Sequence, residues 1–120
     1  MAKPQYIGNA VQPEQPVWFY KGEDTDGVYW SYTEADGVTP FDFTGYTEAE
    51  LIITDKPVRQ KSESVVTTYT ETGGELAFNS DKIELNVVLD QEYGDYRYEM
   101  WATNASGNRK LFSTGPFEIR

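Results

Sequence analysis

Apolar and polar residues alternate with a period of two along most of this 120-residue chain. The alternation is clearest in the run IELNVVL at residues 83–89, where Val88 alone breaks it. Because successive side chains of a strand point to opposite faces, the pattern predicts a half-buried strand. Similar runs predict strands at residues 17–21, 28–32, 49–54, 65–70, 75–78, 96–103, 109–113 and 117–120. The sequence shows no sustained 3.6-residue apolar repeat, so we expect no helix longer than one turn.

Short turn-forming stretches separate these runs, among them GEDTDG, EADG, NSD, EYGD and NASGN. Glycine, aspartate, asparagine and serine favour turns, and Gly107 in the last stretch is placed to adopt a positive φ angle. Seven to nine short strands at this spacing predict an all-β fold, an antiparallel β-sandwich or a small barrel.

The inward faces of the predicted strands should supply the core. Trp18 and Trp30 are expected there too, because tryptophan is usually mostly buried. The other expected core residues are Leu51, Ile53, Leu76, Phe78, Ile83, Leu85, Val87, Leu89, Tyr96, Tyr98, Phe117 and Ile119.

Residues 1–16 differ from the rest in being polar and in containing three prolines, which favour extended backbone. We expect an extended N-terminal arm at 1–16, with a frayed terminus as the alternative. Residues 17–120 then form a single β-sandwich domain. In such an arm Tyr6 and Ile7 are candidates for contact with a neighbouring subunit, because an extended segment can add to a sheet edge.

The charge balance bears on partners and chemistry. Twenty acidic residues against ten basic ones give a net charge of −10, which disfavours nucleic acid and anionic membranes. The chain has no histidine or cysteine, the commonest general base, thiol nucleophile and transition-metal ligands. We therefore expect neither an enzyme nor a cofactor. The first residues lack the apolar segment of a secretory signal, so we also expect no export by a signal peptide.

The stretch GEDTDG raises the question of calcium, because Asp24 and Asp26 could supply oxygen ligands. It lacks the further acidic ligands and the final glutamate of an EF-hand loop. Aspartate and glycine are ordinary turn residues, so we expect a solvated turn and no metal.

The central stretch FDFTGYTEAELIITDK reads as a sheet corner followed by a strand. Asp42 or Thr44 can accept hydrogen bonds from nearby amides, and Gly45 permits a sharp bend. Further along, EYGDYRY resembles the tyrosine corner of immunoglobulin-like sandwiches, in which a tyrosine hydroxyl bonds to backbone upstream. Tyr96 would be that tyrosine, and Tyr98 would occupy the core position where antibody domains place a cysteine.

Together these motifs resemble small immunoglobulin-like domains of tailed-phage virions, such as the N-terminal domains of upper-baseplate and tail-associated proteins. The resemblance covers residues 15–120. It implies a non-enzymatic virion protein, a tail or baseplate adaptor or a capsid decoration protein, which is assembled in the host cytoplasm and binds other virion proteins or copies of itself. The residues that carry it are Asp42, Phe43, Thr44 and Gly45, then Gly94, Tyr96 and Tyr98, and finally Gly115, Phe117 and Ile119.

Regular alternation in the strand at 96–103 points Arg97, Glu99 and Trp101 outward, as a candidate protein interface. Tryptophan and arginine are enriched in such contacts. A bulge that turns Trp101 into the core is the alternative. The many aromatic residues also leave open a second function, a carbohydrate-binding module that stacks tryptophan or tyrosine on sugar rings.

Overall fold

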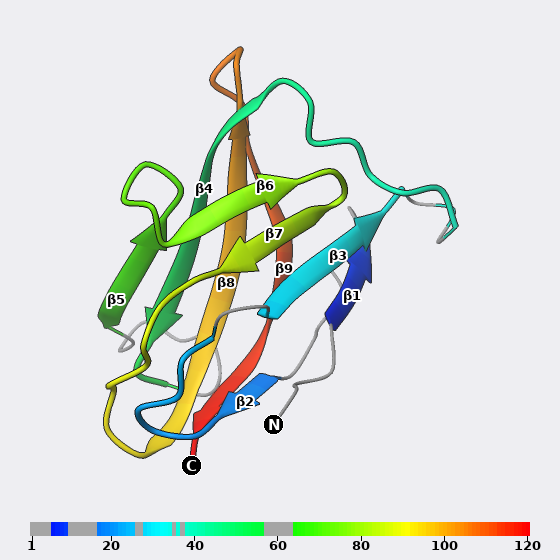
Figure 1. Ribbon diagram of the computed structural model, residues 1–120. Coiled ribbons are helices and arrows are strands. Elements are labelled where there is room, and N and C mark those ends of the chain that lie inside the picture. Colours follow the sequence, from blue (N-terminus) through cyan, green and yellow to red (C-terminus); the bar gives the residue numbers. More distant parts are fainter. Residues whose placement is uncertain (1–5, 10–16, 26–27, 35, 37, 57–63) are drawn as a thin grey trace.

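The computed structural model describes residues 6–9, 17–25, 28–34, 36, 38–56 and 64–120, with the backbone alone for residues 6–9. In these ranges the chain forms nine strands and no helix, so none that could span a membrane (Figure 1). The expected all-β fold is confirmed for this part of the chain. The strands are β1 (Tyr6–Asn9), β2 (Val17–Phe19), β3 (Val28–Thr33), β4 (Tyr46–Thr54), β5 (Val65–Thr70), β6 (Leu76–Asn79), β7 (Lys82–Leu85), β8 (Gly94–Asn104) and β9 (Arg109–Ile119).

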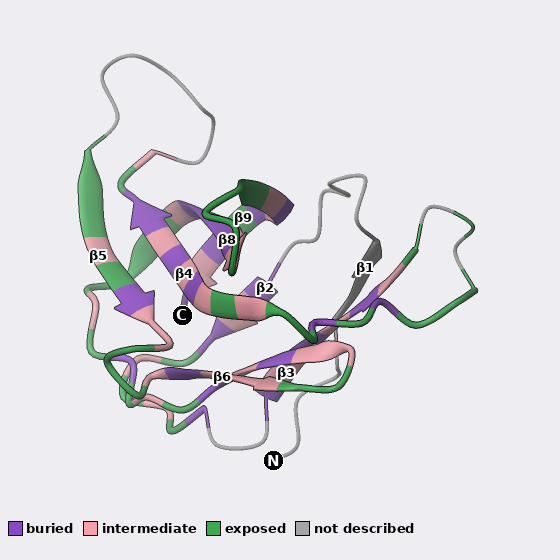
Figure 2. Cartoon of the chain, turned by 90° about the horizontal axis from the view of Figure 1, so that it is seen from above, coloured by how far each residue is buried: buried purple, intermediate pink, exposed green. Residues whose placement is uncertain are grey.

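The strands form two sheets that pack against each other. One has the order β1-β3-β7-β6 and the other the order β2-β9-β8-β4-β5. Figure 2 shows buried residues in strands of both layers, and the buried hydrophobic residues of the two sheets form one core. Most neighbours are antiparallel, but β1 pairs with β3, and β2 with β9, in parallel. The antiparallel expectation is therefore wrong for these two pairs. Parallel neighbours need a long connection, and both pairs have one.

The expected core residues other than Trp18 lie in or against the core. Phe78, Val87 and Tyr96 are partly buried at its margin, and the rest of these are buried. Trp30 is fully buried, and its indole nitrogen donates a hydrogen bond to the Tyr98 hydroxyl of the opposite sheet at 3.3 Å.

The expectation that Trp18 belongs to the core is wrong. Val17 and Phe19 take the inward positions of β2, and the alternation of the strand leaves Trp18 half-buried on the outer face. The Arg120 guanidinium carbon lies 4.3 Å from the centre of its ring.

The two predicted corners are present. Asp42 Oδ1 accepts a hydrogen bond from the Thr44 amide at 2.8 Å, and Gly45 has a φ of +89°. The Tyr96 hydroxyl donates to the backbone carbonyl of Glu92 at 2.8 Å, as the resemblance to a tyrosine corner implied. The positive φ expected at Gly107 is also confirmed, at +86°.

Several strand boundaries differ from the prediction, and two of the differences have a clear cause. β7 ends at Leu85 instead of continuing to Leu89, because Val87 bonds to Thr25: its amide donates to Thr25 Oγ1 and its carbonyl accepts from the Thr25 amide, both at 2.9 Å. The two short strands predicted over residues 109–120 are one strand, β9. Its register against β8 shifts at Phe112, so that Phe112 and Ser113 are both buried.

Candidate functional site

The candidate site lies on the outer face of the five-stranded sheet, along its central strand β8. Tyr98 and Met100 point into the core, and the residues that alternate with them, Arg97, Glu99 and Trp101, lie on the opposite face. The structure thus brings these three predicted residues together on one side of one strand.

Arg97 and Glu99 form a buried ion pair. Arg97 Nη1 lies 2.8 Å from Glu99 Oε2, and the two side chains are 8% and 10% exposed. Arg97 Nη1 also donates to Thr114 Oγ1 of β9 at 3.2 Å. The two residues lie on the outward face of β8, as predicted, but they are buried there because they pair with each other and are flanked by β4 and β9. Their part in a protein interface stays a prediction.

Trp101 is half-buried and held on two sides. Its indole nitrogen donates to Glu99 Oε1 at 2.9 Å, and the Arg109 guanidinium carbon lies 3.8 Å from the centre of its ring. Arg109 Nε in turn donates to Glu50 Oε1 of β4 at 3.3 Å. A bulge does occur beside Trp101, but its extra residue, Phe112, belongs to β9, and Trp101 keeps its outward direction.

These contacts form a continuous network across three strands, which we call the sheet-face network: Glu50, Arg97, Glu99, Trp101, Arg109 and Thr114. Its buried end, Arg97 with Glu99, fixes the indole. At its open end the Arg109 side chain is 43% exposed and that of Glu50 is 31% exposed. The solvent-exposed end of the network therefore consists of the Arg109 guanidinium stacked on the Trp101 indole, with the Glu50 carboxylate beside it.

Sequence reasoning missed Arg109 and Glu50. The hairpin register pairs Thr103 with Arg109 and Trp101 with Leu111, which makes Arg109 a diagonal neighbour of Trp101. Counting outward from the turn at 104–108 could have indicated this contact. Glu50 lies opposite Trp101 on β4, far away in the sequence, and no local pattern indicates that pairing.

Tyr6 and Ile7, the other candidate contact residues, lie in β1. They pair with Trp30 and Ser31 of β3 in the same chain. A free arm would pair with another subunit. Here the edge strand β3 of the same chain supplies the main-chain partners of β1. The remaining residues of the predicted arm, 1–5 and 10–16, lie outside the described residues.

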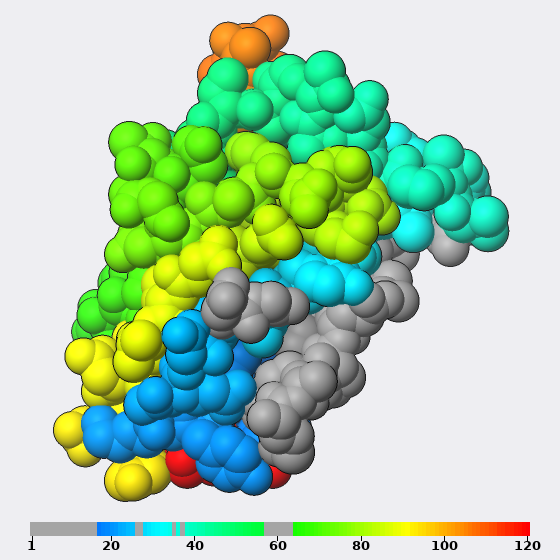
Figure 3. Space-filling model, in the orientation of Figure 1, coloured from blue at the N-terminus to red at the C-terminus, as the bar shows by residue number. Residues whose placement is uncertain are grey.

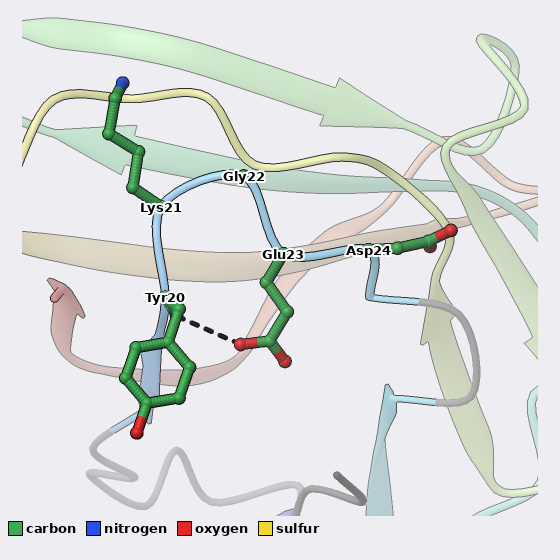
Figure 4. Close-up of a pocket in the computed structure, with 5 residues that line it drawn as sticks. All are labelled: Tyr20, Lys21, Gly22, Glu23 and Asp24. Carbon is green, nitrogen blue, oxygen red and sulfur yellow. Dashed lines mark hydrogen bonds between the residues drawn. The ribbon is translucent and has the colours of Figure 1, made fainter.

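A hollow of about 360 Å³ lies where the chain leaves β2, and it is lined by residues 20–24 (Figure 4). The Tyr20 amide donates to Glu23 Oε1 at 3.0 Å, while Lys21 and Asp24 point away from that bond. Lys21 Nζ donates to the carbonyl of Asp90 at 2.9 Å. This bond joins the segment after β2 to the segment before β8, which meet at the lower end of the molecule in Figure 3.

Asp24, one of the two residues considered as calcium ligands, lines this same hollow. Asp24 forms an isolated bridge with Val88, and Asp26 lies outside the described residues. The described part of the chain contains no group of three or more acidic side chains placed to hold a metal ion.

Two exposed aromatic side chains that could bind sugar, Tyr20 and Tyr93, lie at or near this hollow. Tyr20 is 49% exposed, and its ring packs edge-on against Trp18 with the ring centres 5.3 Å apart. Tyr93, in the segment before β8, is 68% exposed.

No protein-family model matches this chain, and no curated protein matches it either. The function proposed below therefore rests on the geometry of these surfaces and on the resemblance of the sequence motifs.

Proposed function

We propose that this protein is a non-enzymatic structural subunit of a tailed-phage virion that acts through protein–protein contacts. It serves as a tail or baseplate adaptor or as a capsid decoration protein, and its partners are other virion proteins. The stack of Arg109 on Trp101 is the observation that carries the proposal. Tryptophan and arginine are over-represented among the residues that dominate binding at protein interfaces.

The surroundings of the stack support this role. Glu99 fixes the indole and Glu50 fixes the guanidinium, so both side chains are already ordered in the free protein. Binding costs less when the contacting groups are ordered beforehand. A partner that covers the stack would also shield the Arg109–Glu50 pair from water, which would strengthen its electrostatic attraction.

We also propose that the sandwich is immunoglobulin-like, which is the fold that the virion resemblance implies. In this assignment β1, β3, β7 and β6 correspond to strands A, B, E and D, and β9, β8, β4 and β5 to strands G, F, C and C′. The bond from Tyr96 to Glu92 at the start of β8 supports it. So does the contact of Trp30 with Tyr98, which joins β3 to β8 where antibody domains have a disulfide.

The chain supplies a matched pair of variants to test the contact surface. Arg109→Ala removes the cation above Trp101, and Arg120→Ala removes a similar cation above Trp18 at the other end of the same sheet. We expect wild-type protein in purified virions by mass spectrometry. Arg109→Ala should load at least tenfold less well, as expected for the loss of about 1.4 kcal/mol or more of binding free energy. Arg120→Ala should load normally.

Absence of the wild-type protein from virions would overturn the virion role. Equal loading of the wild-type protein and Arg109→Ala would leave that role in place but remove the sheet-face network as the contact surface.

The alternative function, carbohydrate binding by aromatic stacking, is favoured by the exposed Tyr20 beside Trp18. Sugar titrations followed by tryptophan fluorescence separate the two functions. A saturable change that Tyr20→Ala abolishes and Arg109→Ala leaves intact would favour the carbohydrate-binding function.

A further inference from the structure

Exposed apolar side chains gather at the lower end of the molecule in Figure 3, where the segment after β2 meets the segment before β8. Six large apolar side chains are exposed in the described part of the chain, and three of them belong to these two segments, residues 20–25 and 86–95: Tyr20, Val88 and Tyr93. Tyr20 packs against Trp18 and points away from Lys21 (Figure 4). Val88 and Tyr93 are 60% and 68% exposed, so packing within the described chain leaves both open to solvent.

Hydrogen bonds hold the two segments together. The Gly22 amide donates to the Leu89 carbonyl, and the Leu89 amide donates to the Glu23 carbonyl at 3.0 Å. The buried Thr25 hydroxyl donates to the Leu85 carbonyl at 2.9 Å. Backbone held in this way is ordered before a partner arrives, which lowers the cost of binding.

Two contacts place the exposed apolar side chains beside charged ones. Asp24 and Val88 are paired by an isolated antiparallel bridge, and side chains directly opposite in such a pair lie on the same face. Lys21 Nζ lies 5.9 Å from the centre of the Tyr93 ring and 3.6 Å from Glu92 Oε1. Both apolar side chains therefore have a carboxylate in their neighbourhood.

This end of the molecule is more acidic than the chain as a whole. The chain has 20 acidic and 10 basic residues, whereas the two segments contain one basic residue, Lys21, and five acidic ones: Glu23, Asp24, Asp90, Glu92 and Asp95. The Lys21 ammonium donates to the carbonyls of Asp90 and Gln91 at 2.9 and 3.3 Å, so it bonds to its own chain. Five exposed residues make up what we call the end surface: Asp24, Val88, Asp90, Glu92 and Tyr93.

We propose that the end surface binds a basic segment of a partner protein. Arginine and lysine side chains combine an apolar stem with a cationic head. Their stems can cover Val88 while their heads reach the carboxylates of Asp24 and Asp90. An arginine can also stack on the face of the Tyr93 ring.

Charge argues against other occupants. A second copy of the chain carries a net charge of −10, and it would bring like charges to an acidic surface. A wholly apolar segment would take water from the carboxylates without replacing their hydrogen bonds. The inference goes beyond the proposed function, because it concerns a surface other than the sheet-face network and holds whether or not the protein belongs to a virion.

The first test is an NMR titration of the purified chain with a short synthetic peptide of alternating arginine and serine, up to about 1 mM. We expect the largest changes of amide chemical shift in residues 20–25 and 86–95, and no binding of a peptide of alternating glutamate and serine. Changes spread over every acidic stretch of the chain, or no change, would overturn the proposal. Equal binding of a peptide of alternating leucine and serine would also overturn it, in favour of an apolar occupant.

The second test compares two charge reversals that alter the net charge of the chain equally. Glu92→Lys puts a cation into the end surface, and Glu34→Lys puts one at an exposed position after β3. Like charges across a contact are strongly unfavourable. We therefore expect Glu92→Lys to weaken binding of the arginine peptide at least tenfold, and Glu34→Lys to weaken it far less. Equal losses would mean that net charge alone attracts the peptide, and would overturn the proposal.

A third comparison tests the apolar part of the end surface. Tyr93→Ser should weaken binding of the arginine peptide, whereas Val38→Ser, at a valine that is also exposed, should not. Equal affinities of these two variants would contradict the stacking on Tyr93 and overturn the proposal. Arg109→Ala should bind the peptide as well as wild type does, and a loss there would assign the peptide to the sheet-face network instead.

Discussion

At the scale of single residues, Arg97 and Glu99 show that two charges can lie on the outer face of a sheet without reaching solvent. Residues two apart on a strand share a face, and here opposite charges meet at 2.8 Å. Such a pair adds little net stability over apolar residues, but loss of one partner leaves the other charge buried. The pair therefore fixes the position of Trp101 and makes the fold sensitive to either substitution.

We predict that Glu99→Ala lowers the free energy of unfolding by about 3–5 kcal/mol, the usual cost of breaking a buried ion pair. Glu118→Ala is the matched control, because its pair with Arg120 has side chains 41% and 47% exposed. An exposed pair contributes about 0–1 kcal/mol. Urea denaturation followed by tryptophan fluorescence measures both. A loss at Glu99→Ala no larger than that at Glu118→Ala would contradict the role given to the buried pair.

The alternation of β8 was enough to place Arg97, Glu99 and Trp101 on one face, since that is a local property of a strand. Their burial was not predictable in the same way. It depends on β4, which pairs with β8 across about fifty residues of sequence, and on the packing of side chains from both neighbours. The same reason explains why Glu50 was missed as a neighbour of Trp101.

At the scale of elements, Glu48 ties β4 to the turn between β5 and β6. Its Oε1 accepts from the amides of Ala49, Glu71 and Thr72 at 3.0, 2.9 and 3.2 Å, and its Oε2 accepts from the Thr72 hydroxyl. Partial burial alone would raise the pKa of Glu48. The hydrogen bonds outweigh it and hold that pKa below its ordinary value of 4.5.

A lowered pKa in the folded state means that ionised Glu48 stabilises the fold above its ordinary pKa. That contribution is lost as pH falls through the folded-state pKa. Glu48→Gln should therefore lower the free energy of unfolding by about 1 kcal/mol at pH 7, where charged hydrogen bonds become neutral ones. The difference from wild type should shrink below the ordinary pKa of 4.5. Urea midpoints at several pH values test this, and a difference independent of pH would rule out the charge as its cause.

At this scale, contacts between residues close together in the sequence could be predicted, and contacts between distant residues could not. The Asp42 corner and the Tyr96 corner were predictable, because each depends on residues within four positions of one another. The end of β7 was not, because it depends on Thr25, about sixty residues away. The parallel neighbours of β3 and β9 were missed for a related reason, since period-two alternation does not encode the direction of the partner strand.

At the scale of the whole molecule, the two sheets share one core. The chain passes repeatedly from one sheet to the other, and Trp30 of the four-stranded sheet bonds to Tyr98 of the five-stranded sheet. Unfolding of either sheet would therefore expose the buried face of the other sheet to solvent. We therefore expect the described strands to unfold as one cooperative unit, as most single domains of this size do.

Leu85→Ala tests this cooperativity. Leu85 is fully buried in β7, and its truncation should lower the free energy of unfolding by about 2–5 kcal/mol. Since the core is shared, the loss should appear equally in tryptophan fluorescence, which reports on local packing, and in far-ultraviolet circular dichroism, which reports on all strands. The two curves should coincide in wild type and variant alike, with the slope against urea unchanged. Separate transitions in the variant would mean that the four-stranded sheet unfolds first, so that the five-stranded sheet, with the sheet-face network, would be stable without it.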